Sequence, residues 1–172
     1  ENATVPGPEQ QRSCDRYRIL YIEDNPANLK LVSEILATQP NIELLTAHEA
    51  LLGLDLAISC RPQLILLDIN MPHLSGYKII NILQQDVRLQ GIPVVAITAS
   101  AMPQDIERGK AAGFTEYLTK PLDIEHFLQV VNHYLREADA AQPGSPAHLP
   151  LVPIARGSGA WLHDFDGKRY LD

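Results

Sequence analysis

The central part of the chain alternates short apolar runs with longer segments whose apolar residues recur at helical spacing. The short runs are apolar on successive residues rather than on every second one, which is typical of strands buried on both faces of a parallel sheet. They span residues 18–22, 42–46, 64–67, 94–97 and 117–119. Such alternation predicts a parallel sheet covered by helices on both faces.

Residues that begin or end helices mark the five longer segments. A proline in the first turn, an aspartate at the N-cap and a glycine after the last turn are each favoured at those places. The segments begin at Asn25-Pro26, at about His48, after Gly76, after Met102-Pro103 and at Asp123, and the second and fourth end at about Ser59 and at Gly113. Five strands and five helices in turn predict an α/β fold, a doubly wound (βα)5 domain with a five-stranded parallel sheet.

Proline gathers on either side of this alternating region. Six of the 13 prolines lie there, namely Pro6, Pro8, Pro143, Pro146, Pro150 and Pro153. We therefore expect a linker over residues 1–16, the folded domain over 17–136, a proline-rich linker over 137–153 and a hairpin-like tail over 154–172, with flexible extensions at both ends of the domain.

Composition narrows the classes of function. The 172 residues, 45% of them hydrophobic, suffice for one domain with a stable core. The net charge of -7 argues against a surface for nucleic acid or anionic lipid. Two distant cysteines, Cys14 and Cys60, provide neither a disulfide framework nor a zinc knuckle. No apolar run approaches the roughly 20 residues that cross a membrane, so we expect a cytoplasmic protein that binds neither membrane nor nucleic acid.

Polar side chains follow four of the five predicted strands at the point where each strand ends. Glu23 and Asp24 come after the first strand, Asp68 after the third, Thr98 after the fourth and Lys120 after the fifth. Because the carboxyl ends of parallel strands meet at one edge of the sheet, where such folds bind ligands, we expect these five side chains to converge.

Three carboxylates at one edge repel one another unless positive charge lies among them. Lys120 supplies one positive charge, and Mg²⁺ suits the remainder because it prefers oxygen ligands and takes one or two carboxylates. A pocket neutralised in this way can accept a phosphoryl group. Asp68 is then the candidate nucleophile that forms an aspartyl phosphate, and the Thr98 hydroxyl would bond to a phosphoryl oxygen.

Four motifs carry a resemblance to a known family. They are YIEDNPANLKL, LILLDINMPHLSGY, VVAITASA and TEYLTKPL, in this order. With them, the segment from about residue 18 to 135 resembles a response regulator receiver domain of two-component signalling. The resemblance implies the flavodoxin-like strand order 2-1-3-4-5, which is the order found in receiver proteins and which periodicity alone does not supply.

The resemblance also implies roles for single residues. Asp24 and Asp68 ligate Mg²⁺, the backbone carbonyl of Asn70 completes the protein ligands, and Glu23 acts directly or through water. Lys120 contacts the phosphoryl group, and its bond to Pro121 is expected to be cis. Thr98 and Tyr117 form a switch pair, in which the ring turns inward when the hydroxyl is drawn to the phosphate.

The implied activity is that of a phosphoacceptor rather than an enzyme. Asp68 takes a phosphoryl group from the phosphohistidine of a histidine kinase or histidine phosphotransfer protein and loses it slowly to water. The fourth helix, fifth strand and fifth helix form the readout face, which would contact a second copy or a downstream domain. A hybrid histidine kinase, or a regulator fused to an enzyme, is the expected parent protein.

Two alternatives stay open. Phosphohydrolases of the haloacid dehalogenase type also use an Asp nucleophile after a strand, but they carry a second Asp two residues later, where this chain has Asn70. A docking scaffold that is never phosphorylated is the other alternative, and it is disfavoured because every reactive position is filled.

The tail over 154–172 contains a second, shorter pattern. Residues 160–163 and 168–171 flank Asp166-Gly167, a strong turn signal, so they predict a β-hairpin. The tail also resembles the opening hairpin of class III pyridoxal-phosphate aminotransferases. That resemblance implies the start of a fused enzyme domain whose catalytic lysine would lie beyond Asp172, and an unrelated hairpin is the alternative.

Overall fold

The computed structural model describes residues 16–100, 102–141, 154–158, 161–164 and 169–171. The chain divides after Leu135 into two units, and each is considered by itself. The predicted linkers over 1–16 and 137–153 lie largely outside the described residues.

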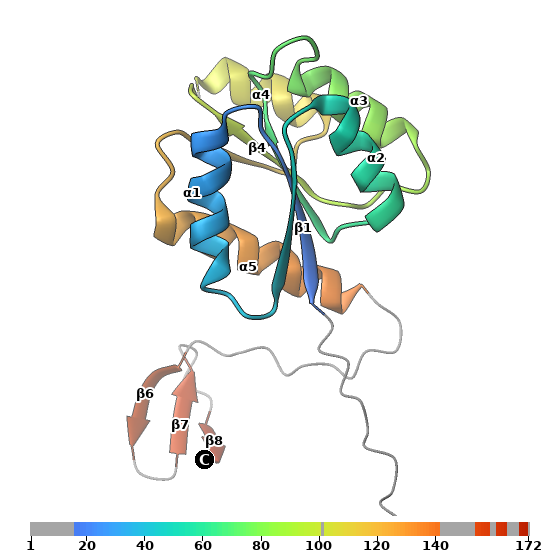
Figure 1. Cartoon of the computed structure of the whole chain (residues 1–172). Coiled ribbons are helices and arrows are strands. Elements are labelled where there is room, and N and C mark those ends of the chain that lie inside the picture. Colours follow the sequence, from blue (N-terminus) through green and yellow to red (C-terminus); the bar gives the residue numbers. More distant parts are fainter. Residues whose placement is uncertain (1–15, 101, 142–153, 159–160, 165–168, 172) are drawn as a thin grey trace, which may run out of the picture. The chain divides into compact units, whose positions relative to one another are not determined.

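Strands and helices alternate strictly through the first unit (Figure 1). The strands are β1 (Tyr17–Ile22), β2 (Ile42–Ala47), β3 (Leu64–Asp68), β4 (Val94–Thr98) and β5 (Glu116–Thr119). The helices are α1 (Pro26–Ala37), α2 (Ala50–Cys60), α3 (Gly76–Gln85), α4 (Pro103–Ala112) and α5 (Ile124–Ala140). The predicted five strands and five helices are confirmed.

The five strands form one parallel sheet in the order β2-β1-β3-β4-β5. The flavodoxin-like order that the family resemblance implied is therefore confirmed. In this order β1 and β3 lie at the centre, and the chain reverses its direction of winding between them. The carboxyl ends beside that point are where open α/β sheets bind ligands.

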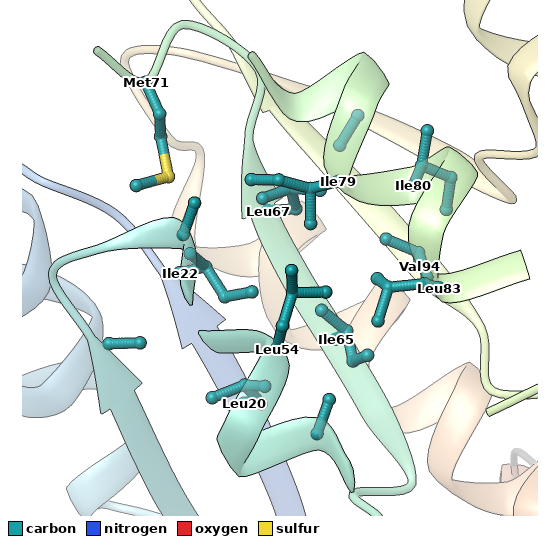
Figure 2. Close-up of a cluster of buried hydrophobic side chains, with 14 of the residues drawn as sticks. Leu20, Ile22, Leu54, Ile65, Leu67, Met71, Ile79, Ile80, Leu83 and Val94 are labelled. Atoms are coloured by element: carbon teal, nitrogen blue, oxygen red, sulfur yellow. The ribbon is translucent and has the colours of Figure 1, made fainter. Parts of the chain in front are cut away.

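Successive residues of each strand enter opposite hydrophobic layers, because side chains alternate across a sheet. On β1, Leu20 and Ile22 face the layer under α2 and α3, whereas Ile19 and Tyr21 face the layer under α1 and α5. Figure 2 shows the first layer, in which Leu54 of α2 and residues of α3 meet strand residues. Burial on both faces explains why the strands read as continuous apolar runs.

The ends of three helices follow the predicted signals. The Asn25 side chain accepts a hydrogen bond from the Ala27 amide at 2.9 Å, which caps α1. The Asp123 carboxylate accepts one from the His126 amide at 2.8 Å at the start of α5. Gly113 ends α4 with a φ of 107°, a left-handed conformation that favours glycine.

The last helix continues beyond the end of the predicted domain. α5 continues to Ala140, beyond residue 136, where the apolar stripe ends and the linker was expected to begin. The residues after Leu135 are mostly good helix formers, so the helix continues without an apolar face. A proline disfavours helical geometry in the residue before it, so Pro143 is the sequence feature that marks the end of this helix, rather than the end of its apolar stripe at Leu135.

The second unit contains three short antiparallel strands rather than two. They are β6 (Ile154–Ser158), β7 (Trp161–Asp164) and β8 (Arg169–Leu171), in the order β6-β7-β8. β7 and β8 form the predicted hairpin, and Asp166-Gly167 of its turn lies outside the described residues. β6 was not predicted, because its sequence IARGS has no run of strand-favouring residues.

Within the described part of the chain, no helix combines the length and the apolar character that crossing a membrane requires.

Candidate functional site at the carboxyl edge of the sheet

The carboxyl ends of β1, β3 and β5 bring four predicted residues together. Glu23 and Asp24 directly follow β1, Asp68 is the last residue of β3, and Lys120 directly follows β5. Carboxylate oxygens of Glu23, Asp24 and Asp68 all lie within 4.8 Å of one another. The convergence predicted from the strand ends is therefore present for four of the five residues, and Thr98 is the fifth.

Lys120 joins two of these carboxylates. Its Nζ donates a hydrogen bond to Asp68 Oδ2 at 2.7 Å and another to Glu23 Oε2 at 2.8 Å. Both acids are buried, whereas the Lys120 side chain is 25% exposed. The lysine backbone is itself fixed, since its amide donates to the Thr98 carbonyl at 2.8 Å and its bond to Pro121 is cis, as expected.

Glu23 is fully buried and is surrounded by donors. Besides Lys120, its Oε2 accepts from the Tyr21 hydroxyl at 2.8 Å and from Asn28 Nδ2 at 3.1 Å, and its Oε1 accepts from the Asn25 amide at 3.1 Å. Burial by itself would raise the pKa of the Glu23 carboxyl, but the hydrogen bonds from Lys120, Tyr21 and Asn25 outweigh burial and hold this pKa below its usual value.

Asp68 has a less favourable environment for its charge. Burial, followed by repulsion from the Glu23 charge, raises the pKa of the Asp68 carboxyl, although Lys120 and the Asn70 amide act in the opposite direction. The Asn70 amide donates to Asp68 Oδ1 at 2.9 Å. Gly76 lets the start of α3 approach closely, because a Cβ there would lie 3.0 Å from the Asp68 carbonyl oxygen.

The donor set fits a hard divalent cation. The three clustered ligand groups are carboxylates, and Asp24 is exposed, so it can be reached from solvent. Oxygen ligands of this kind suit Mg²⁺, which keeps several waters and needs only one or two carboxylates. One lysine does not neutralise three acids, so a divalent cation would also supply the missing positive charge. The metal role of the Asn70 carbonyl stays a prediction.

Thr98 is the last residue of β4, and its hydroxyl forms hydrogen bonds with the loop that follows this strand. Thr98 Oγ1 donates to the Ser100 carbonyl at 2.9 Å and accepts from the Ser100 amide at 3.2 Å. Thr98 is buried and sits opposite Thr119 in the β4–β5 register. It thus occupies the expected strand end, while its role toward a phosphoryl group stays a prediction.

Tyr117 is a residue of β5, and its ring lies between this strand and α4. Its hydroxyl is buried and has no hydrogen-bond partner among the described residues. The ring packs edge-on against Phe114, with 5.7 Å between ring centroids. Burial, with a smaller effect of the nearby Tyr77, raises the pKa of Tyr117 to about 12. The ring tip is therefore turned into the protein in this structure.

The sequence did not point to three of the residues that hold Glu23, namely Tyr21, Asn25 and Asn28. The strand pattern treated Tyr21 as one apolar position among aliphatic neighbours. A signal was nevertheless present, since a buried tyrosine needs a partner for its hydroxyl and residues two apart on a strand share a face. Asn28 was harder to foresee, because its contact depends on where α1 begins relative to the site.

Comparisons with known proteins agree with this geometry. The model of the response regulator receiver domain family matches residues 19–132. The chain is 37% identical over 120 residues to the polar-differentiation response regulator DivK of Brucella anthropi, a match that covers 70% of this chain and 97% of that protein.

Two similar solved structures share the fold. One is the chemotaxis response regulator CheY4 of Vibrio cholerae, with a TM-score of 0.65, 25% identity, and coverage of 69% of this chain and 98% of that one. The other is the receiver domain of a sensor histidine kinase from Pseudomonas aeruginosa PAO1, solved with a magnesium ion in its active-site cleft, with a TM-score of 0.64, 25% identity, and coverage of 70% and 98%. The strand order, the acidic cluster and these matches together show that the chain belongs to the response regulator receiver domain family.

Proposed function

We propose that this receiver domain accepts a phosphoryl group on Asp68 with the help of Mg²⁺. The observation that carries the proposal is the Lys120 ammonium, which lies 2.7 Å from Asp68 Oδ2 and within the same group of acids as Asp24 and Glu23. A carboxylate nucleophile beside a cation that can neutralise the phosphoryl oxygens is the arrangement that aspartyl phosphate formation requires.

The transfer itself is a displacement at phosphorus. A carboxylate oxygen of Asp68 forms a bond to phosphorus while the phosphorus–nitrogen bond of a donor phosphohistidine breaks, and the electron pair of that bond stays on the imidazole. Lys120 then donates to a phosphoryl oxygen, for which it gives up one of its present carboxylate contacts. The phosphoryl donor is a histidine kinase or a histidine phosphotransfer protein.

Asp24 and Asp68 would hold the metal through carboxylate oxygens and Asn70 through its backbone carbonyl, with Glu23 acting directly or through water. Bound there, Mg²⁺ would neutralise charge on the phosphoryl oxygens. The chain's own part is to keep the acids within 4.8 Å of one another and to keep Lys120 beside them.

The proposal includes a conformational response. The Thr98 hydroxyl would exchange its bond to the Ser100 carbonyl for one to a phosphoryl oxygen. Such charge-assisted hydrogen bonds, about 1.5–3 kcal/mol each, are sufficient to shift a two-state element whose states differ by a few kcal/mol. Tyr117 would respond, and the face formed by α4, β5 and α5 would transmit the change to a second copy or a downstream domain.

The parent protein in this proposal is a hybrid histidine kinase or a regulator fused to an enzyme. The domain itself is a phosphoacceptor that loses its phosphate slowly to water. A phosphohydrolase has less support, because the position two residues after Asp68 is Asn70, whose amide group cannot serve as a general acid and base.

The test is incubation of the chain with Mg²⁺ and a small acyl phosphate, followed by intact mass measurement. We expect one added phosphate that hydroxylamine removes, and none on the Asp68→Asn variant. Asp55→Asn, an exposed aspartate on α2, is the matched control and should be phosphorylated as the unmodified chain is. Unchanged phosphorylation of Asp68→Asn, or none of the unmodified chain, would contradict the proposal.

A further inference from the structure

We propose that Tyr21 is a positioning residue for phosphoryl transfer, which it serves by fixing the Glu23 carboxylate and, through it, Lys120. This inference rests on the proposed function and adds a residue to its machinery. The contact that carries it is the hydrogen bond of 2.8 Å from the Tyr21 hydroxyl to Glu23 Oε2.

Tyr21 is a rigid donor. It is fully buried on β1, in the hydrophobic layer under α1 and α5. A packed aromatic ring has few rotatable bonds, so its hydroxyl is held in one place by the core. Lys120, by contrast, reaches the site on a flexible stem from the opposite half of the sheet and is partly exposed. The tyrosine is therefore the fixed partner of Glu23 and the lysine the adjustable one.

The donors are divided unequally between the two oxygens of Glu23. Oε2 accepts from Tyr21, Asn28 and Lys120, whereas Oε1 accepts only from the Asn25 amide among the described residues. This division sets the rotation of the carboxylate. Oε2 is tied to the protein, and Oε1 keeps acceptor capacity for a metal ion or its water.

Loss of the Tyr21 hydroxyl would let the Glu23 carboxylate rotate without leaving a cavity in the core. In Tyr21→Phe the ring still fills its place, but Oε2 loses one of three donors and the carboxylate can rotate. The Lys120 ammonium, which contacts the same oxygen, then has a less defined position beside Asp68. Groups that orient metal ligands in this way typically account for 10–100-fold in metal affinity or activity.

The experiment measures two quantities on Tyr21→Phe, namely the Mg²⁺ dissociation constant by calorimetry and the phosphorylation rate by a small acyl phosphate at saturating Mg²⁺. We expect weaker Mg²⁺ binding and a rate lower by about tenfold. Tyr134→Phe is the matched control, because this tyrosine of α5 donates its hydroxyl to the Thr115 carbonyl rather than to Glu23. Both quantities should be unchanged in this control.

A double-mutant cycle with Glu23→Ala, which removes the acceptor oxygen, separates positioning from packing. If Tyr21 acts through Glu23, then Tyr21→Phe should change the rate by less than about twofold in the Glu23→Ala background. A packing role would give the same loss in both backgrounds and would overturn the inference. Asn28→Ala removes another donor to Oε2 from a half-buried side chain, so it should show the same coupling even if Tyr21→Phe fails to fold.

The outcomes also distinguish this inference from the proposed function. If the unmodified chain is phosphorylated and Tyr21→Phe matches it in rate and in Mg²⁺ affinity, only the role of Tyr21 is wrong. If the unmodified chain takes no phosphate, the proposed function is wrong, and the Mg²⁺ dissociation constants in the same cycle still decide whether Tyr21 positions Glu23.

Discussion

Gly109 of α4 leaves the space that the Tyr117 hydroxyl of β5 occupies. A Cβ built on Gly109 would overlap the tyrosine oxygen, so no other residue fits there while the ring is turned inward. The hydroxyl is buried and has no partner in the described part of the chain. The position of the ring that is expected to act as the switch therefore depends on a glycine in the adjacent helix.

Gly109→Ala should displace the Tyr117 ring toward solvent. In an ordinary helix interior this change stabilises a protein by about 1 kcal/mol, but here the clash should remove that gain. The pKa of Tyr117, raised by burial to about 12, should fall toward the ordinary value of about 10. Titration of ring-labelled tyrosine by nuclear magnetic resonance measures this pKa.

Assignment of that signal comes from Tyr117→Phe, in which it disappears. Ala111→Gly, at an exposed position in the same helix, provides the comparison for helix propensity and should cost about 1 kcal/mol. A Gly109→Ala variant that gains the full stability of an ordinary helix position, with the pKa of Tyr117 still at about 12, would show that the glycine does not control the ring.

Tyr117→Phe should stabilise the protein at neutral pH. The change removes a buried hydroxyl that lacks a hydrogen bond and keeps the ring contact with Phe114. Relief of an unsatisfied buried hydroxyl is expected to raise the free energy of unfolding by about 1 kcal/mol. Urea unfolding measures the difference, and a loss of stability would mean that the hydroxyl has a partner.

The same tyrosine predicts a decline in stability at alkaline pH. Because its pKa in the folded protein is raised to about 12 from about 10, the unfolded chain loses this proton first. The stability that Tyr117 contributes is thus complete below about pH 10 and lost as the pH rises toward 12. Tyr117→Phe should have a shallower decline in the free energy of unfolding over this range, and an identical slope would contradict the assignment.

Asp68→Asn should make the metal-free protein more stable at pH 7. Burial and the Glu23 charge raise the pKa of Asp68, so its ionised form is less favourable in the folded than in the unfolded chain. That unfavourable contribution is absent below the unfolded pKa and develops as the pH rises through the folded pKa. Unfolding between about pH 4 and 7 with a chelator should show the gain appear.

With Mg²⁺ bound, the unmodified chain should become more stable than Asp68→Asn. A ligand at a hundred times its dissociation constant adds about 2.7 kcal/mol to the folded state, and the unmodified chain should gain more than Asp68→Asn, which lacks one carboxylate ligand. Equal gains in both proteins would place the metal elsewhere.

Lys120→Ala should destabilise the metal-free protein and make it more dependent on Mg²⁺. Without the ammonium, the buried carboxylates of Glu23 and Asp68 each lose one hydrogen-bond donor. A buried polar group left without its partner costs about 1–3 kcal/mol. We expect retained metal binding with signalling lost. Lys30→Ala, in an exposed pair with Glu34, should change stability by less than about 1 kcal/mol.

A rescue experiment completes this comparison. Added Mg²⁺ should restore more stability to Lys120→Ala than to the unmodified chain, because the cation replaces the missing charge. Lys120→Ala with unaltered stability in a chelator would mean that the lysine does not neutralise the acids.

Strand ends were the part of the site that the sequence revealed best. A buried parallel strand is a continuous apolar run, and the polar residues at its end mark the edge where ligands bind, so Asp68 and Lys120 were found without any knowledge of packing. Tyr21 was missed because its role depends on a hydroxyl within an apolar strand. Gly109 was missed because its role appears only once α4 lies against β5.

The ends of helices and strands were likewise predicted only in part. The apolar stripe of α5 ended at Leu135, but the helix continues to Ala140, since helix formation needs no apolar face for its last turn. β6 was missed because strand pairing rather than residue preference forms it.

The most direct test of the central claim locates the phosphate in the chain. After phosphorylation with Mg²⁺ and a small acyl phosphate, borohydride reduces an aspartyl phosphate to homoserine, and peptide mass spectrometry identifies the converted residue. We predict homoserine at position 68, and none when Mg²⁺ is chelated. Homoserine at Asp24 or at another aspartate, with position 68 unchanged, would contradict the account.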